Sequence, residues 1–577
     1  MKTKLTLTLT LIRFTAACLA LALLGGAALP ALAYPRTVTS TKDDGSAGTL
    51  REQIRISGDT DTITFTVTGT IVLTNTSGGT TSGELLVGQG LTIIGPGATN
   101  LTISGNNSHR VFEFVAGKTS TISGLTISNG RDGADGANAS VTCVNNSPVY
   151  TSATPGAAGV GAGILNNGTL TVSNCILSGN RAVGGAGGNG NGAPISGCGG
   201  GPNPYTYPPG TATSGADGKG GAVFNGGTLN LFGCTLSSNS ATGGTGGTGG
   251  PSHDSSFLPS PGKTGGAAAG GAVCNTGSVT LVNCTLAGNA AAAGSGGGGG
   301  GTNGYNGTGP PGAAGGAGGN GTGGAIENLN TANGACTLNS CTVSGNSVSA
   351  GSGGTGGTGS TAGANGANGQ ALGGGTHAVS GLAFYYTIVA LNNAASGGPD
   401  VYGGFGSGNF NLIGKTDGSS GTWKSEDQTG SILAPLPPAL GPLQDNGGPT
   451  PTMALLEGSP AIDKANSAAS GAPHTDQRGF KRPVNFSDTY YPNASGGNGA
   501  DIGAFEVQPP ALTETRTGTK VVVTWPSPST GFVLQQNGTI TNTNGWSNFG
   551  GTVSSNSTTM SITNTTPTGN LFYRLKQ

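Results

Sequence analysis

Charged side chains are scarce in this sequence. Lys, Arg, Asp and Glu make up 8% of its 577 residues, and the formal net charge is −1, whereas about a quarter of an ordinary protein is charged. Nucleic-acid binding depends on Lys and Arg side chains that neutralise phosphates, so we predict no nucleic-acid partner. Solubility must come from Ser, Thr, Asn and exposed backbone instead.

Acidic residues are rarest in the middle of the chain, where residues 136–399 contain only Asp217, Asp254 and Glu327. Glycoside hydrolysis needs two carboxylates that face one sugar bond, and calcium-assisted lyases need several acidic ligands and a base. We therefore expect these three residues to be solvated loop charges, and we predict no catalytic residue. A carbohydrate-active β-helix enzyme, either a polysaccharide lyase or a glycosidase, stays open as an alternative through the acidic residues nearer the C-terminal end.

Patterns typical of metal ligands are missing as well. The nine cysteines include no Cys-x-x-Cys pair and the four histidines are scattered, so the spacing of zinc ligands is absent. We predict neither a metal nor another cofactor. Four cysteines occupy the same position of a repeat, and we predict that they stack as a mostly reduced ladder because their parallel side chains would strain a disulfide. They are Cys175, Cys234, Cys284 and Cys341.

Long apolar runs are confined to the N-terminal end. Basic residues within the first 13 positions precede an apolar run at 14–24, and residues 31–33 (Ala-Leu-Ala) resemble a cleavage site. We therefore predict a signal peptide over residues 1–33. No later run reaches the roughly 18 apolar residues of a transmembrane helix, so we expect a secreted or surface-attached chain without a transmembrane segment after signal removal.

Glycine, in contrast, is abundant, with 116 residues, and glycine marks the start of an internal repeat. The copies are GAGILNNGTLTVSNCILSGN (161–180), GGAVFNGGTLNLFGCTLSSN (220–239), GGAVCNTGSVTLVNCTLAGN (270–289), GGAIENLNTANGACTLNSCTVSGN (323–346) and a degenerate fifth at 381–393. Apolar residues alternate with small or polar ones, which indicates β-strands. Cysteine and the closing asparagine each keep one column, as stacked coils require. The repeat predicts an all-β parallel β-helix.

Glycine-rich insertions lie between the closing Asn of one copy and the Gly-Gly-Ala of the next. They are residues 130–160, 181–219, 240–269, 290–322 and 347–372. Glycine often recurs every third residue, which is the period of a polyproline II helix, although disorder stays open because ordering glycine costs the most entropy. We predict that all five leave one corner of the solenoid and form a loose sheaf with partial polyproline II character, which is the partner-facing surface.

Several segments resemble known families. The segment GSAGTLREQI (45–54) followed by DTITF (61–65) resembles the entry of bacterial secreted right-handed β-helix proteins, and the Gly-Gly-Ala units resemble repeats of chlamydial polymorphic membrane proteins. This resemblance implies a right-handed helix. Four later motifs are similar, in order, to the choice-of-anchor Q domain, a module that ends β-helices of bacterial surface proteins. They are GNFNLIG (408–414), GPLQDNGGPTPTMALLEGSPAID (441–463), TDQRGFKRP (475–483) and ADIGAFE (500–506).

These observations predict a division of the chain into five parts. They are the signal peptide (1–33), an N-terminal cap with the first coils (34–130), β-helix repeats with glycine-rich insertions (131–407), a choice-of-anchor Q-like end of the β-helix (408–508) and a small C-terminal β-sandwich (511–577). The sandwich is inferred from short strand patterns such as KVVVTWP, in which Val521, Val523 and Trp525 alternate toward one face.

The densest charges of the chain lie in the choice-of-anchor Q-like motifs. With two nearby tyrosines able to stack on a sugar, they form a candidate ligand site: Asp463, Asp476, Arg478, Arg482, Tyr490, Tyr491, Asp501 and Glu506. The alternative is a structural role, in which Asp and Arg pair to pin loops against the last coil. We expect a non-enzymatic bacterial surface or extracellular protein for adhesion or matrix contact, with an extracellular polysaccharide or a host or matrix protein as partner.

Overall fold

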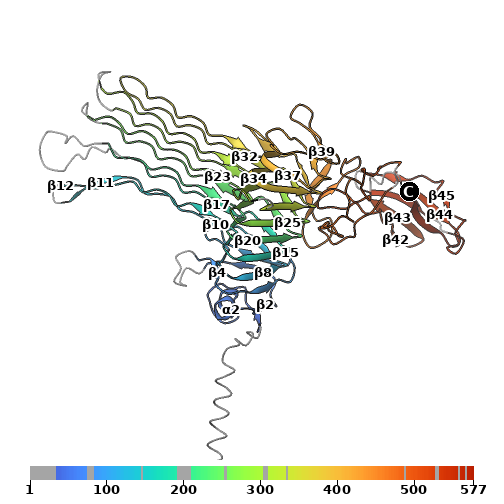
Figure 1. The fold of residues 1–577 in the computed structure, drawn as a ribbon. Coiled ribbons are helices and arrows are strands. Elements are labelled where there is room, and N and C mark those ends of the chain that lie inside the picture. Colours follow the sequence, from blue (N-terminus) through green and yellow to red (C-terminus); the bar gives the residue numbers. More distant parts are fainter. Residues whose placement is uncertain are drawn as a thin grey trace, which may run out of the picture.

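The computed structural model describes residues 34–576 except for short gaps. The gaps are 75–82, 145–146, 191–208, 253–256, 303–308, 333–334, 487–488, 527–531, 557–558 and 566–567. The predicted signal peptide lies outside the described residues. Figure 1 shows stacked coils of parallel strands, a bundle of extended segments on one side and a small C-terminal unit on the other. The predicted all-β parallel β-helix is thus confirmed, and α2 (Leu50–Ile56), beside the first coils, is the only helix among the described residues.

Each repeat coil adds one strand to each of the two limbs of the largest parallel sheet and one strand to a second long parallel sheet. The largest sheet has one limb of β1 (Pro35–Val38), β2 (Thr62–Phe65), β5 (Thr92–Ile94), β8 (Thr119–Ser123), β15 (Thr169–Ser173), β20 (Thr228–Phe232), β25 (Ser278–Val282) and β30 (Cys336–Asn339). Its other limb is β4 (Leu85–Val87), β7 (Phe112–Phe114), β14 (Ile164–Asn166), β19 (Val223–Asn225), β24 (Val273–Asn275) and β29 (Ile326–Asn328). The strand β34 (Thr376–Tyr385) joins both limbs and pairs with β37 (Val401–Ser407).

The second long sheet follows the largest one in every coil. It contains β3 (Gly69–Val72), β6 (Leu101–Ser104), β9 (Thr126–Ser128), β16 (Ile176–Ser178), β21 (Thr235–Ser237), β26 (Thr285–Ala287), β31 (Thr342–Ser344), β35 (Ile388–Ala390), β38 (Leu412–Ile413) and β39 (Gln428–Thr429). A short antiparallel pair, β40 (Leu440–Gln444) and β41 (Thr452–Leu455), comes after the last of these strands.

The solenoid core consists of stacked columns of identical or similar side chains. Leu229 pairs in register with Leu170 on one side and Val279 on the other, and all three are buried. The columns through Leu231 and Leu236 stack in the same way, as the repeat alignment predicts. Because strands of a sheet lie about 4.8 Å apart, each inward side chain packs on its equivalents in the coils above and below.

Asparagine side chains form a ladder at the closing corner of the coils. The Asn239 amide donates to Asn289 Oδ1 at 2.9 Å and to the Leu177 carbonyl at 2.9 Å, and Asn239 Oδ1 accepts from the Asn180 amide at 2.9 Å. The same pattern continues through Asn346 and Asn392. A second ladder, which sequence analysis did not identify, joins the asparagines at the end of the short limb: Asn166, Asn225, Asn275 and Asn328.

The cysteine column also lies inside the solenoid. Cys175, Cys234, Cys284 and Cys341 are free and fully buried in successive coils, and Thr387 continues the column. The predicted reduced ladder therefore agrees with the structure. Burial raises the pKa of the Cys234 and Cys284 thiols well above their usual value, which keeps them protonated and unreactive.

The glycine-rich insertions leave the solenoid between two short parallel sheets. One sheet contains β10 (Arg131–Asp132), β17 (Arg181–Val183), β22 (Ser240–Thr242), β27 (Ala290–Ala292), β32 (Ser347–Ser349) and β36 (Asn393–Ala394). The other contains β13 (Gly159–Val160), β18 (Gly218–Lys219), β23 (Ala268–Ala269), β28 (Gly321–Thr322) and β33 (Ala371–Leu372). Alanines such as Ala268 and Ala291 pack between them. All five insertions thus leave from one corner, as predicted.

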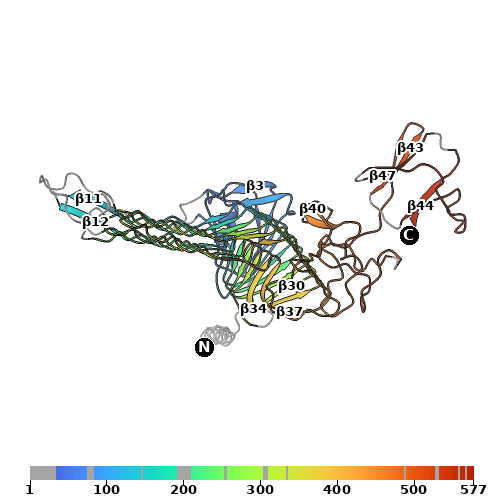
Figure 2. The same cartoon turned by 90° about the horizontal axis from the view of Figure 1, so that it is seen from above.

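Beyond these roots, the insertions form one bundle, the glycine-rich sheaf (Figures 1 and 2). Each insertion runs away from the solenoid as an outgoing segment and comes back as a returning segment. The outgoing segments are 133–139, 184–190, 243–252, 293–302 and 350–359, and the returning ones are 154–158, 209–217, 258–267, 309–320 and 361–370. The tip of the first insertion is a hairpin of β11 (Ser140–Val144) and β12 (Ser147–Thr151).

Backbone hydrogen bonds between segments hold the sheaf together and recur every third residue. In the third insertion, Gly246 and Gly249 donate to carbonyls of the next outgoing segment at 2.8 and 2.9 Å, and Gly243 donates to Ala292 at the root of that segment at 2.9 Å. Gly244 and Gly247 donate to the preceding returning segment at 2.8 and 2.9 Å. One turn per three residues is the repeat of a polyproline II helix. We expected a loose sheaf, and this expectation is wrong. The sheaf is an ordered two-layered bundle in which each segment forms hydrogen bonds to neighbours in both directions.

Glycine is required at the two inward positions of each triplet because backbones approach closely there. A Cβ atom on Gly297 would lie 2.0 Å from the Gly247 carbonyl oxygen, whereas a Cβ on the outward neighbour Gly298 would meet no heavy atom closer than 3.6 Å. At the last edge of the sheaf, Asn368 and Asn365 side chains accept from the N–H groups of Gly353 and Gly356 at 2.9 Å. These asparagines occupy the backbone N–H groups that would otherwise bind a further glycine-rich segment at this edge.

The C-terminal unit is a small β-sandwich of two antiparallel sheets. The first contains β42 (Thr513–Thr517), β43 (Lys520–Pro526), β47 (Thr559–Asn564) and β46 (Ser554–Ser555), and the second contains β45 (Ser547–Asn548), β44 (Val533–Asn537) and β48 (Phe572–Lys576). Val521, Val523 and Trp525 are buried between the sheets, as their alternation predicts. Figures 1 and 2 show the sandwich and the sheaf on opposite sides of the solenoid.

We expect Asn239→Ala to destabilise the solenoid by about 2–5 kcal/mol, because it leaves the buried Asn180 amide and the Leu177 carbonyl without their partner. The change should appear as a lower urea midpoint of unfolding. Thr228→Ala, on the exposed face of the same coil, is the control and should change the free energy of unfolding by less than about 0.5 kcal/mol. Equal midpoints for both variants would show that the ladder adds little.

We expect Gly297→Ala to loosen the sheaf and Gly298→Ala to leave it intact, since only the first substitution places a methyl group against backbone. Overpacking of this kind costs about 1–3 kcal/mol, so amides of the third and fourth insertions should exchange with deuterium roughly 5- to 100-fold faster in Gly297→Ala. The same exchange rates in both variants would contradict the close packing of the segments.

Candidate functional site

The charged residues of the predicted ligand site come together in a buried ionic cluster, formed by Asp463, Asp476, Arg478, Arg482, Asp501 and Glu506. Arg478 Nη2 lies 2.7 Å from Asp476 Oδ2, and Arg482 Nη1 lies 3.3 Å from Glu506 Oε2. The side chains of both pairs are at most 5% exposed. The cluster thus pairs its charges internally.

The carboxylates of the ionic cluster also accept hydrogen bonds from backbone N–H groups. Asp501 accepts from Asp463 at 2.8 Å and from Val507 at 2.6 Å, and Glu506 accepts from Val484 at 2.6 Å and from Asp501 at 2.9 Å. Asp476 accepts from the backbone of Glu506 at 3.0 Å. Oxygens occupied in this way and shielded from solvent are not available to a sugar, so the geometry favours the structural role of these residues.

Burial is the main reason why the pKa is raised for the two acidic residues at the centre of the ionic cluster. The Asp501 pKa is raised well above its usual value by burial first and by the Glu506 charge second, and burial raises the Glu506 pKa as well. The folded state therefore binds a proton more tightly than the unfolded chain does. It follows that this pair destabilises folding increasingly as the pH rises above the ordinary carboxyl pKa of about 4.

The loops that carry the ionic cluster pack on the outer face of the second long sheet. Gln477 accepts from Thr285 Oγ1 at 2.6 Å and donates to Thr235 Oγ1 at 2.9 Å, and Thr342 Oγ1 accepts from the Ala504 N–H at 3.0 Å. These threonines belong to β21, β26 and β31. The loops therefore do cover the last coil, where Ile388 and Leu412 share a core with Ile502, and they also run back along the side of three earlier coils.

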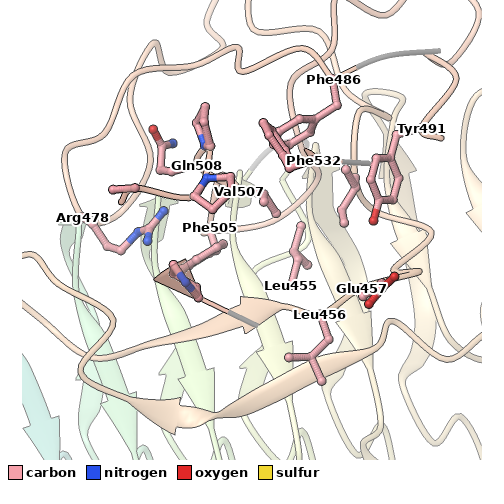
Figure 3. Close-up of a pocket in the computed structure, with 15 residues that line it drawn as sticks. Leu455, Leu456, Glu457, Arg478, Phe486, Tyr491, Phe505, Val507, Gln508 and Phe532 are labelled. Atoms are coloured by element: carbon pink, nitrogen blue, oxygen red, sulfur yellow. The ribbon is translucent and has the colours of Figure 1, made fainter. Parts of the chain in front are cut away.

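The two candidate tyrosines lie apart from the ionic cluster. Tyr490 is exposed, and Tyr491 packs beside Phe486 with 5.9 Å between the ring centroids. Tyr491 lines a cavity of about 300 Å³ together with residues from the loops and from the sandwich (Figure 3). Sequence analysis missed this cavity because its aromatic residues, Phe486, Phe505 and Phe532, come from separate segments and form no motif.

The acidic residues of the repeat region have different environments. Asp217 forms a partly exposed ion pair with Lys219 at 3.0 Å, and Asp254 lies outside the described residues. Glu327, in contrast, is buried in β29, and its Oε1 lies 2.9 Å from His377 Nδ1. Its expected role as a solvated loop charge is wrong, because its partner sits at the same position of the next coil, 50 residues later.

The described residues offer neither a grouped set of metal ligands nor a helix that could span a membrane. In the part of the chain that the structure describes, no three His, Cys, Asp or Glu side chains are grouped so that they could hold a metal ion. No helix of the described residues is both long and apolar enough to cross a bilayer.

The sheaf presents two broad faces with few charges, because it is only two segments thick. The outward residues of the outgoing segments include many exposed hydroxyl groups, among them Thr245, Thr248, Ser352, Thr355 and Thr358, and we call this the hydroxyl face. The outward residues of the returning segments combine exposed hydroxyl groups, such as Ser214 and Thr264, with exposed small or apolar side chains, among them Pro261, Pro311, Ala314, Ala364 and Ala367. The two faces thus differ in their share of apolar side chains, and hydroxyl-bearing side chains on one segment recur about every 9 Å.

Comparison with known proteins gives no family assignment, since no family model matches the chain and no curated protein is significantly similar to it. The resemblances to choice-of-anchor Q domains and to polymorphic membrane protein repeats therefore stay hypotheses.

We expect Arg482→Met to destabilise the loops between residues 463 and 507 by about 3–5 kcal/mol, because it leaves Glu506 and the carbonyls of Asp501 and Gly503 buried without their cation. The change should appear as faster proteolysis within these loops. Arg516→Met is the control, since Arg516 and its partner Glu514 are mostly exposed and such pairs contribute at most about 1 kcal/mol. Similar proteolysis of both variants would contradict the structural role.

Proposed function

We propose that the chain is a non-enzymatic bacterial surface or extracellular protein that contacts its partner through the glycine-rich sheaf. The partner is an extracellular polysaccharide or a host or matrix protein. The observation that carries this proposal is the order of the sheaf, which projects from one side of the solenoid (Figure 2) and exposes two faces with few charges.

The construction of the sheaf supports a role at its surface. Its segments have almost no apolar core beyond the alanines at their roots, so they add little to the stability of the solenoid. Ordering so many glycines costs conformational entropy. A rigid surface repays this cost in binding, because a preorganised partner loses less freedom when a complex forms.

The chemistry of the two faces defines the kind of partner. Beyond the root strands and Asp217 next to them, the described part of the sheaf carries two charged side chains, Asp135 and Lys263. Attraction between opposite charges therefore contributes little to binding. Hydroxyl groups at regular spacing suit the hydroxyl groups of a neutral polysaccharide or the polar backbone of a protein. Binding should accordingly depend weakly on ionic strength.

The arrangement of the ends is consistent with display at a cell surface. The predicted signal peptide would export the chain, and the choice-of-anchor Q-like part and the sandwich lie on the side of the solenoid that faces away from the sheaf (Figure 1). If this end attaches the protein to the cell, the sheaf points outward.

The test removes the sheaf from an otherwise intact chain. Each insertion is shortened to its root strands, for example from β17 to β18, and closed with a short Gly-Ser link. We expect this variant to keep the free energy of unfolding of the solenoid, measured in urea, within about 1 kcal/mol of wild type because core columns are untouched, and to lose binding in a screen of glycans and matrix proteins. Release of reducing ends is measured in parallel to detect glycosidase or lyase activity.

Paired charge substitutions identify the binding face. Thr245→Glu with Thr248→Glu alters the hydroxyl face, and Ala314→Glu with Ala364→Glu alters the opposite face with the same added charge. Only one of the two pairs should abolish binding. Undiminished binding by a folded sheaf-free variant, or release of reducing ends by the wild type, would overturn the proposal.

A further inference from the structure

The cavity beside the ionic cluster has no part in the function proposed for the sheaf. It measures about 300 Å³ and opens between the loops and the C-terminal sandwich (Figure 3). This volume lies at the lower end of the range of small-molecule pockets, about 300–1,000 Å³. Its walls are mostly apolar, with Leu455, Ile462 and Val507 among the aliphatic residues.

Three aromatic rings meet on one side of the cavity. Phe486 lies at the centre of the group, 5.9 Å from Tyr491 at an interplanar angle of 56° and 6.0 Å from Phe532 at 88°. The rings therefore point in different directions around the same space. Because the face of an aromatic ring is electron-rich, such a group attracts a cation that enters between the rings.

A carboxylate lies on the same side of the cavity. Glu457 is exposed and lines the cavity, and Figure 3 shows its side chain next to Tyr491. Glu457 forms no ion pair with any residue that the structure describes, unlike the acidic residues of the ionic cluster. It therefore supplies an uncompensated negative charge at an otherwise apolar site.

The cation of Arg478 is on the other side of the cavity and is already neutralised. Its guanidinium group lies 2.7 Å from Asp476 and 3.5 Å above the ring of Phe505, and Figure 3 shows both residues away from Tyr491 and Glu457. Arg478 thus occupies one face of Phe505. Phe505 is therefore set apart from the group formed by the other three rings.

We propose that Phe486, Tyr491 and Phe532, together with Glu457, form an aromatic cage that binds a quaternary ammonium group. Such a group carries a positive charge on an apolar, methyl-covered surface, so it gains from the aromatic faces and from the apolar wall at once. A neutral apolar ligand would gain nothing from Glu457. A primary ammonium would lose more hydration on entering.

The test uses the full mature chain and two ligands of the same shape. Choline carries the charge, and 3,3-dimethylbutan-1-ol is its neutral counterpart. We expect isothermal titration calorimetry to show choline binding at least about fivefold tighter than the neutral alcohol. Binding of the alcohol with equal or higher affinity, or no choline binding at millimolar concentration, overturns the proposal.

Variants assign the binding to this cavity. Tyr491→Leu keeps apolar volume but removes a ring, and Glu457→Gln removes only the charge; each should weaken choline binding about two- to tenfold. Asp44→Asn, which removes an exposed charge beside the first coils, is the control and should leave the affinity unchanged. An equal loss in Asp44→Asn, or no loss in either cavity variant, would refute the cage.

A last arm separates two sources of the same chemical group. Wild-type protein is sedimented with vesicles of phosphatidylcholine and, in parallel, of phosphatidylglycerol. Given choline binding, retention on phosphatidylcholine alone that free choline reverses identifies a lipid headgroup as the source. No retention identifies a small soluble ligand, since the cavity then admits the free group only.

Discussion

The structure depends on one constraint, which is the in-register stacking of each coil on the next. Parallel strands about 4.8 Å apart place every residue of a repeat on its counterpart, so one alignment fixes the core columns, both asparagine ladders and the roots of the insertions. Asn239 illustrates the effect, because its amide bonds to Asn289 in the next coil and its oxygen to Asn180 in the preceding one. A side chain that is satisfied only by its neighbours stabilises no coil in isolation.

The sheaf extends the same register beyond the hydrophobic core. Its segments begin one strand spacing apart, so each is held at a high effective concentration for its neighbours, which offsets part of the entropy of ordering glycine. Hydrogen bonds then replace apolar burial as the source of cohesion. Gly244 bonds to the preceding insertion and Gly243 to the following one, and this requires a backbone without side chains on two of its three sides.

A feature of the structure could be predicted from the sequence where the residues that determine it form a pattern along the chain. The repeat columns, such as Leu170 over Leu229, were predictable because alternation and spacing repeat along the chain. The tight packing of the sheaf was not, since glycine triplets alone fit disorder equally well and the contact of Gly297 with Gly247 exists only after stacking. Glu327 appeared to be a loop charge because its partner, His377, is 50 residues away. Gln477 and Thr235, 242 residues apart, and the cavity beside Tyr491 left no sequence signal at all.

Stacking also accounts for the unusual distribution of charge. A charged residue in a buried repeat column would face its like in the neighbouring coil at one strand spacing, which is destabilising, so the buried columns contain mainly apolar, thiol, hydroxyl and amide side chains. Like charges stack only where they are exposed among the described repeat strands, as Arg131 does on Arg181. Most buried charges lie outside the repeat columns. The asparagine ladder terminates at Asp400, whose Oδ1 accepts hydrogen bonds from the backbone N–H and from the side-chain amide of Asn392, both at 2.9 Å. Burial raises the pKa of Asp400 to about 6. A carboxylate accepts hydrogen bonds but has no N–H group to donate to a further coil, so the ladder stops at Asp400. The ionic cluster of the following loops covers the side of the coils. The low charge content and the buried ionic cluster are thus two consequences of the same register.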